Sequence, residues 1–103
     1  MTDIRRKLNH FEKKVFKALQ TAGLKPYISV VAISGSLYIK FNNPALRSLR
    51  VGNHDGRGKY KYKWNLRDDW KIISTEIDKY PRFYYPSQDY EEMIEDMKRF
   101  INV

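Results

Sequence analysis

Strict alternation of polar and apolar residues in two runs of the chain most limits the fold. Residues 37–41 read LYIKF and residues 59–64 read KYKYKW. Successive side chains of a β-strand point to opposite faces, so a period of two predicts strands rather than helices. The loop 52–58, between the two runs, has an Asp-Gly pair and three glycines, which is typical of a hairpin turn. We therefore expect a sheet with one packed face.

Two amphipathic stripes predict helices at the two ends of this sheet. Residues 2–22 carry apolar side chains at three- and four-residue spacings, with Thr2 as the N-cap and Gly23 as the stop signal. Residues 87–101 carry the second stripe, and Ser87 would cap that helix. The outer face of the first helix could either follow a phosphate backbone or simply face solvent. It is basic and includes Arg5, Arg6, Lys7, Lys13, Lys14 and Lys17.

Four segments between the stripes have strand character, namely 27–33, 37–41, 48–51 and 59–67. Ser-Gly-Ser would join the first two, and the glycine loop would join the last two as an antiparallel hairpin. We expect an α+β two-layer sandwich, with an antiparallel sheet of three to five strands and the order α-β-β-β-β-α. Residues 80–86 read YPRFYYP and suggest an aromatic loop that is either a lid on the core or a protein-binding patch.

The composition is that of one folded domain over residues 1–103. Of the 103 residues, 42% are hydrophobic and 15% aromatic, which is enough apolar area to form a core. The sequence has no cysteine and two histidines, so we expect no metal and no cofactor. No apolar run approaches the roughly 18 residues of a membrane span, and the first residues lack a signal peptide's apolar core. We expect a cytoplasmic protein without a membrane partner, and its oligomeric state stays open.

The formal net charge is +8, and it is unevenly distributed. Residues 1–71 contain 16 Lys/Arg against 5 Asp/Glu, whereas residues 72–103 contain 4 against 7. Such asymmetry is expected of a protein that binds polyanions with one part of its surface. It favours nucleic acid, RNA or DNA, or a nucleoprotein complex as the partner.

The sequence favours a non-catalytic protein that holds a phosphate backbone with a Lys/Arg-rich β-hairpin. In the run 59–67 the lysines alternate with aromatic residues, and the aromatic side is the side expected in the core. Arg50 would be exposed on the preceding strand. Tyr38 could stack on a base, and Tyr60 or Tyr62 could do so if the aromatic side of the run is exposed instead. The candidate binding residues are Tyr38, Lys40, Arg47, Arg50, Arg57, Lys59, Lys61, Lys63 and Arg67.

Catalysis has one weak candidate in this sequence. His54 lies beside Asp55 in the glycine loop, and a carboxylate can tune a histidine that titrates near neutral pH. A turn explains the same two residues. The carboxylates of residues 68–78 match no spacing of a metal-dependent nuclease. A binding protein is therefore preferred to an enzyme.

Two resemblances accompany these inferences. The order of elements around Gly35-Ser36 and Leu49-Arg50-Val51-Gly52-Asn53-His54 resembles the double-stranded-RNA-binding-like fold of HicA-type mRNA interferase toxins, which implies a ribonuclease. The catalytic histidine of that family follows Gly-Ser, and Leu37 stands there in this chain. The tract 46–67 is similar to tracts in small phage and prophage proteins. That similarity implies an inhibitor of a host nucleoprotein complex, such as an anti-CRISPR protein.

Overall fold

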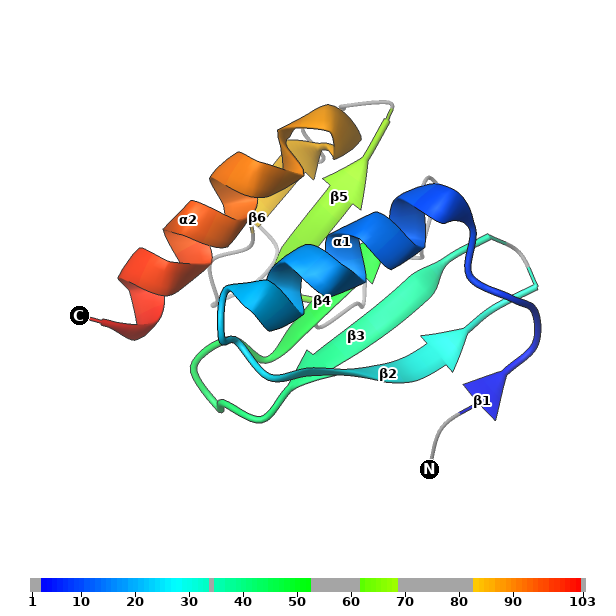
Figure 1. The fold of residues 1–103 in the computed structure, drawn as a ribbon, viewed down its shortest axis with the longest axis horizontal. Coiled ribbons are helices and arrows are strands. Elements are labelled where there is room, and N and C mark those ends of the chain that lie inside the picture. The colour runs from blue at the N-terminus through cyan, green and yellow to red at the C-terminus, as the bar shows by residue number, and fades with distance from the viewer. Residues whose placement is uncertain (1–2, 34, 53–61, 69–82, 103) are drawn as a thin grey trace, which may run out of the picture.

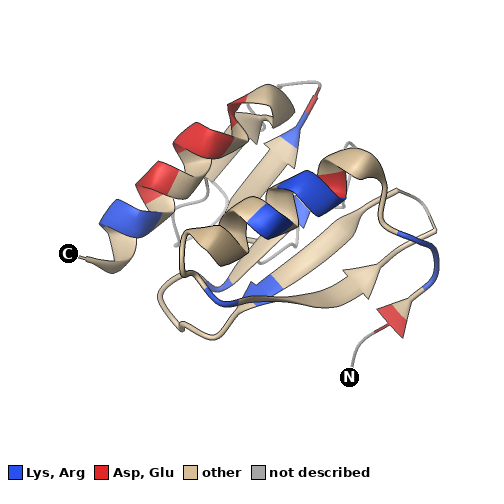
Figure 2. Ribbon diagram, viewed as in Figure 1, with Lys and Arg blue, Asp and Glu red and all other residues tan. Residues whose placement is uncertain are grey.

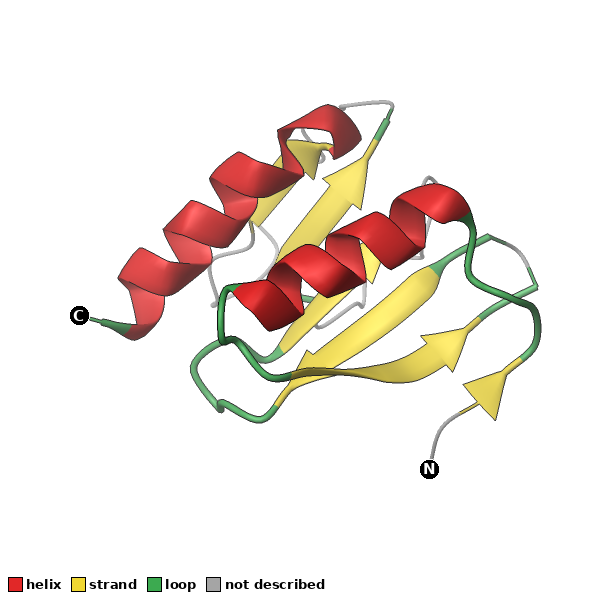
Figure 3. Ribbon diagram, in the orientation of Figure 1, coloured by secondary structure: helices red, strands yellow, loops and turns green. Residues whose placement is uncertain are grey.

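The computed structural model describes residues 3–33, 35–52, 62–68 and 83–102. Figure 1 shows two helices lying over one face of a single sheet, and Figure 3 separates the helical layer from the strand layer. In chain order the elements are β1 (Asp3–Ile4), α1 (His10–Thr21), β2 (Pro26–Val31), β3 (Leu37–Phe41), β4 (Ser48–Val51), β5 (Trp64–Arg67), β6 (Phe83–Pro86), the 3-10 turn Ser87–Asp89 and α2 (Tyr90–Ile101).

The α+β class is confirmed, but the predicted antiparallel sheet of three to five strands is wrong. The sheet has six strands in the order β1-β2-β3-β4-β5-β6. The pairs β2–β3 and β3–β4 are antiparallel, whereas the pairs β1–β2, β4–β5 and β5–β6 are parallel. The predicted hairpin between β4 and β5 is therefore also wrong. Alternation along a strand indicates which side chains share a face, but it carries no information on the direction of the partner strand.

Helix α1 begins at His10 and not at Thr2, because a capping box fixes its first turn. The side chain of Asn9 accepts a hydrogen bond from the backbone N–H of Glu12 at 2.8 Å. The Glu12 carboxylate accepts one from the backbone N–H of Asn9 at 2.9 Å. This reciprocal arrangement satisfies two of the amide groups that a helix start leaves unpaired. The residues before it are therefore free to form β1, in which Ile4 is 60% exposed.

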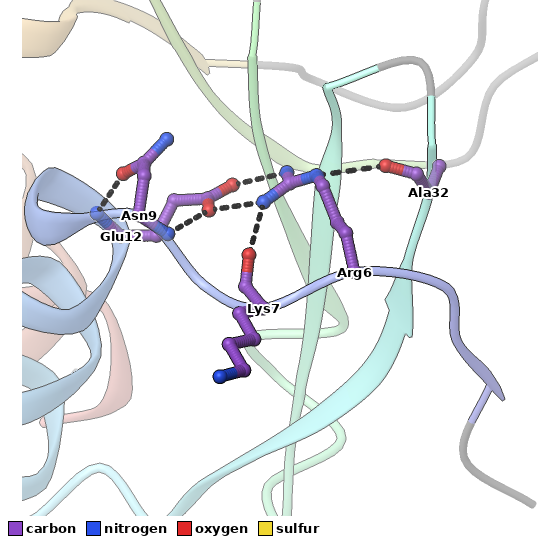
Figure 4. A network of polar contacts seen from close by, with 5 residues as sticks. All are labelled: Arg6, Lys7, Asn9, Glu12 and Ala32. Carbon is purple, nitrogen blue, oxygen red and sulfur yellow. Dashed lines mark hydrogen bonds and ion pairs between the residues drawn. The ribbon is translucent and has the colours of Figure 1, made fainter.

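A buried ion pair connects this N-terminal segment to the body of the domain (Figure 4). The two terminal nitrogens of Arg6 each donate to one oxygen of Glu12, at 2.7 Å in both cases. Its Nε donates to the carbonyl oxygen of Ala32 at 2.9 Å. The Glu12 side chain is 2% exposed, and its hydrogen bond raises the pKa of Arg6. One arginine thus joins the segment after β1 to α1 and to the end of β2.

The core lies between the helices and the sheet, as the strand periodicity predicts. In β3 the side chains of Leu37, Ile39 and Phe41 are buried, while Lys40 between them is exposed. Trp64 and Leu66 of β5 are buried in the same cluster. The aromatic side of the 59–67 run therefore faces the core at Trp64, which confirms the packing interpretation there.

The C-terminal third contains a strand where the sequence predicts an aromatic loop. Residues Phe83–Pro86 form β6 at the end of the sheet, parallel to β5. Helix α2 begins at Tyr90 after a 3-10 turn, so Ser87 is not its N-cap. The predicted apolar stripe of α2 is confirmed by the burial of Tyr90, Met93, Ile94 and Met97. Neither helix in the described part of the chain has the length and apolar character needed to cross a membrane.

Candidate nucleic-acid interface

The side chains that point away from the helices form the second face of the sheet, here called the back face. Strand pairing places them in rows: Tyr38 is opposite Arg50, Arg50 is opposite Asn65, and Asn65 is opposite Tyr84. Among the strand residues that the structure describes, Asp3 is the one acidic residue. The charge of this face is therefore positive at its centre. Its described members on the four strands β3 to β6 are Tyr38, Lys40, Ser48, Arg50, Asn65, Arg67, Tyr84 and Pro86.

Arg50 is buried rather than exposed, which corrects the expectation from the sequence. Its exposed fraction is 6%, and it has Tyr38 on one neighbouring strand and Asn65 on the other. Its Nε and Nη2 atoms have no hydrogen-bond partner among the described residues. A buried charged group with unmade hydrogen bonds is unfavourable in the unbound protein. An anionic oxygen would relieve that cost if it reached these donors, and because both nitrogens are themselves buried, the groups that cover them would have to move first.

An aromatic pair stands beside Arg50 on the same face. The rings of Tyr38 and Tyr62 have centroids 4.9 Å apart and are tilted by 32°. Both side chains are half-buried, so each leaves part of its ring area accessible. Tyr62 precedes β5 and lies outside the strand, which is why it does not share the core position of Trp64. Planar ligands such as nucleobases stack on accessible aromatic rings of this kind.

Two further polar residues surround the arginine and support the face. Asn65 donates through Nδ2 to the carbonyl oxygens of Tyr62 at 3.2 Å and Phe83 at 3.5 Å. Ser48 is buried opposite Lys40, whose side chain is exposed. The two Asn65 hydrogen bonds connect the backbone just before β5 to the start of β6. They thereby help to fix the position of Tyr62.

Arg67 does not lie on an exposed lysine face as the sequence predicts. It is 4% exposed and lies on the back face, paired in register with Pro86 of β6. Arg50 and Arg67 thus occupy adjacent strands of one face. Two buried guanidinium groups so close in the fold strengthen the positive potential at the centre of this face.

Lys63 and Arg47 form a separate basic group near the end of α2. The Lys63 ammonium lies 3.8 Å from the ring centroid of Phe100 and donates to the carbonyl oxygen of Ala45 at 3.4 Å. Burial lowers the pKa of Lys63, and the nearby charge of Arg47 lowers it further. The predicted row of Lys59, Lys61, Lys63 and Arg67 is therefore not continuous in its described part. Arg57, Lys59, Lys61, His54 and Asp55 lie outside the described residues.

The aromatic residues of β6 cover the core rather than forming a free patch. The ring of Phe83 stacks on Trp64 with centroids 4.7 Å apart. Tyr85 lies on the same side, and its hydroxyl donates to the carboxylate of Asp96 in α2 at 2.6 Å. For these two residues the lid interpretation of the 80–86 segment is confirmed.

Sequence reasoning named Tyr38, Lys40 and Arg50 as candidates and Tyr62 as a possible stacking residue. It missed Asn65, because the position of Asn65 opposite Arg50 depends on β5 lying beside β4 in this register. Comparison of the chain with family models, with curated proteins and with solved structures gives no match. Functional inference therefore proceeds from the chemistry of the described residues alone.

Proposed function

We propose that this chain is a non-catalytic nucleic-acid-binding protein that contacts a phosphate through the back face of its sheet. The observation that carries the proposal is Arg50, a buried guanidinium whose Nε and Nη2 donors have no partner in the part of the chain that the structure describes. Arginine is suited to phosphate because its planar donors can bind two oxygens at once.

The neighbours of Arg50 favour nucleic acid over a free inorganic anion. Tyr38 is its direct cross-strand neighbour, and Tyr62 stacks against Tyr38. A nucleotide presents a phosphate and a base a few ångströms apart, so an arginine beside an aromatic pair can contact both. Exposed Lys40 lies two residues from Tyr38 on the same strand and extends the basic surface. Single-stranded RNA or DNA, whose bases are accessible, is the expected ligand.

The direct test is fluorescence anisotropy with labelled single-stranded RNA, single-stranded DNA and duplex DNA, at low and at physiological salt. We expect the single strands to bind more tightly than the duplex, and the affinity to fall steeply with salt as counterions are released. Replacing Tyr38 by Ala should weaken binding by roughly ten-fold, as expected when one base loses its stacking partner. Absence of binding at low salt to any of the three ligands would reject the proposal.

A charge-matched pair of variants separates a specific contact from general attraction. Lys40→Gln removes a charge beside the candidate site, whereas Lys98→Gln removes one from α2, where Lys98 is paired with Glu95 at 3.3 Å. We expect the first variant to reduce the slope of affinity against salt by about one contact and the second to leave it unchanged. Equal effects of both variants would mean that only the net charge of +8 attracts the ligand.

The described residues do not supply the site of the ribonuclease that the HicA resemblance implies. The position after Gly35-Ser36 is Leu37, whose side chain is fully buried in the core. In the described part of the chain, no group of three His, Cys, Asp or Glu residues could hold a metal ion. A binding role therefore agrees better with this region than cleavage does.

A further inference from the structure

A groove on the helix side of the molecule, at the opposite end of the sheet from β6, has the features of a second binding site. It has a volume of about 530 Å³ and lies between the N-terminal segment, the start of α1 and β2. Its apolar walls are aliphatic and come from Ile4, Leu8, Ile28 and Val31. Its basic residues are Arg5, Arg6, Lys7 and Lys13.

Two of these four cations are neutralised within the chain and two are not. Arg5 pairs with Asp3 at 2.9 Å, and Arg6 pairs with Glu12. No ion pair of the described residues involves Lys7 or Lys13, and both lysines are exposed. The groove thus presents an aliphatic floor with two uncompensated positive charges on its rim.

The charge arrangement of α1 extends this rim and is costly for the helix itself. Lys13, Lys14 and Lys17 are exposed, and Figure 2 colours the Lys positions of α1 blue. The one carboxylate of α1, Glu12, is turned inward to Arg6. Lys13 and Lys17 are four residues apart and repel each other, and cations near a helix N-terminus oppose its dipole. A negatively charged partner would offset both effects.

We infer that the groove binds an acidic segment of another protein, with an aliphatic side chain of that segment inserted between Ile4 and Ile28. Charge complementarity selects an acidic partner, because Lys7, Lys13 and Lys17 would each face one of its carboxylates. Ile4 supplies the apolar contact, since it is 60% exposed and would be covered on binding. The site is distinct from the proposed nucleic-acid interface, because Ile4 pairs in register with Val31 on the helix side of the sheet.

The groove suits a protein segment better than a nucleic acid. Its walls contain aliphatic and no aromatic side chains, so it offers bases no ring on which to stack. Aliphatic floors with a charged rim are instead the usual design of grooves that hold peptides. The two ligand classes therefore differ in what they can use here: a peptide uses floor and rim, while a nucleic acid uses the rim alone.

The test measures binding of a fluorescein-labelled peptide of alternating Glu and Leu to the purified full chain. We expect Ile4→Ser to weaken binding about ten-fold by loss of apolar burial. The matched control is Ile33→Ser, because Ile33 is 76% exposed but does not line the groove. Lys13→Glu should weaken binding at least about five-fold, whereas Lys25→Glu, the same charge change beyond the groove, should have less than about a two-fold effect.

Three outcomes would overturn this inference. The first is a peptide affinity that responds equally to Ile4→Ser and Ile33→Ser, which would show that the groove floor is not used. The second is an equal loss of peptide affinity in Lys13→Glu and Lys25→Glu, which would show that only the net charge of the protein attracts the peptide. The third is absence of peptide binding together with oligonucleotide binding that Lys13→Glu weakens, which would assign the groove to nucleic acid. Binding to the back face is measured separately with Tyr38→Ala, so failure of one proposal does not decide the other.

Discussion

Arg50 is a buried guanidinium with two donors that no described residue pairs. Since its Nε and Nη2 groups have no partner among the described residues, an apolar side chain of similar length should be tolerated at this position. We predict that Arg50→Met leaves the free energy of unfolding unchanged or raises it by up to about 2 kcal/mol, while it abolishes most of the oligonucleotide affinity. Urea unfolding and anisotropy on the same preparation measure the two effects.

The same substitution at Arg6 should have the opposite effect on stability. Its three side-chain nitrogens are engaged with Glu12 and Ala32, so Arg6→Met should lower the free energy of unfolding by about 3 kcal/mol. If Arg50→Met destabilised the fold as strongly as Arg6→Met, Arg50 would have a structural role, and its assignment as a ligand-binding residue would fail.

Tyr85 gives the protein a specific response to alkaline pH. Burial raises the pKa of its hydroxyl, and the hydrogen bond to Asp96 raises it further. The folded protein therefore holds this proton above pH about 10, where an unfolded tyrosine loses it. We predict that the stability due to Tyr85 is complete below about pH 10 and is lost as the pH rises above that value, because the unfolded state then releases the proton more readily.

A phenolate absorbance titration checks this order of ionisation. Tyr85 should give a component that titrates above the usual range of a tyrosine, and Tyr85→Phe should remove that late component. Asp96→Asn keeps the hydroxyl but removes the neighbouring negative charge, so it should move the component to lower pH. An unchanged late component in Tyr85→Phe would assign it to another residue.

At the scale of elements, α1 and the segment after β1 depend on one ion pair. We predict that Glu12→Gln lowers the free energy of unfolding by about 3 kcal/mol, because Arg6 then loses the charge that compensates it in a partly buried position. Gln can still accept the hydrogen bond from Asn9, so the helix cap is retained and the loss reports on the ion pair.

The control for this prediction lies in the same segment. The pair Asp3–Arg5 has side chains that are 53% and 62% exposed, so Asp3→Asn should change the free energy of unfolding by less than about 1 kcal/mol. Chemical denaturation of the three proteins in parallel gives both values. Equal effects of the two substitutions would show that burial of Glu12 does not strengthen the pair.

The elements that the sequence predicted best are those whose pattern is local. The stretches 37–41 and 48–51 coincide with β3 and β4, because alternation and the flanking turns determine both ends. The predicted start of α1 was wrong. Ile4 and Leu8 continue the helical spacing toward the N-terminus, although Asn9 is the N-cap at which the helix begins. A periodic pattern does not reveal a cap that interrupts it, and only the hydrogen bonds between Asn9 and Glu12 do so.

The candidate interface was predictable only in part, for a related reason. Tyr38 and Lys40 belong to one strand, so their common face follows from the pleat. The burial of Arg50 and Arg67 is a property of the tertiary arrangement, since Lys40 on the equally interior strand β3 is exposed. The sequence shows a basic strand, but it does not show how many neighbours that strand has.

For the whole molecule, the two proposed sites use opposite faces of one sheet and should act independently. We predict that a saturating single-stranded oligonucleotide changes the affinity for the acidic peptide by less than about two-fold at physiological salt, where charges more than about 8 Å apart are largely screened. Anisotropy of the labelled peptide, titrated with and without unlabelled oligonucleotide, measures this.

Full competition between the two ligands would contradict that prediction, because it would place them on one surface. The acidic outer side of α2 supports separation of the sites. Glu91, Glu92 and Glu95 are exposed there, and Figure 2 shows the acidic segments of α2 in red. An oligonucleotide is repelled from that side of the molecule, whereas the back face carries Arg50 and Arg67.

The position of β6 has a consequence for handling the protein in concentrated solution. It is the last strand in the sheet order, so one row of its backbone groups has no neighbouring strand among those described. A strand edge of this kind can add a strand from a second molecule and start aggregation. Pro86 lacks a backbone N–H and ends the strand after four residues. The edge that could pair with another strand is therefore short. Replacing that proline would therefore lower the solubility of the protein.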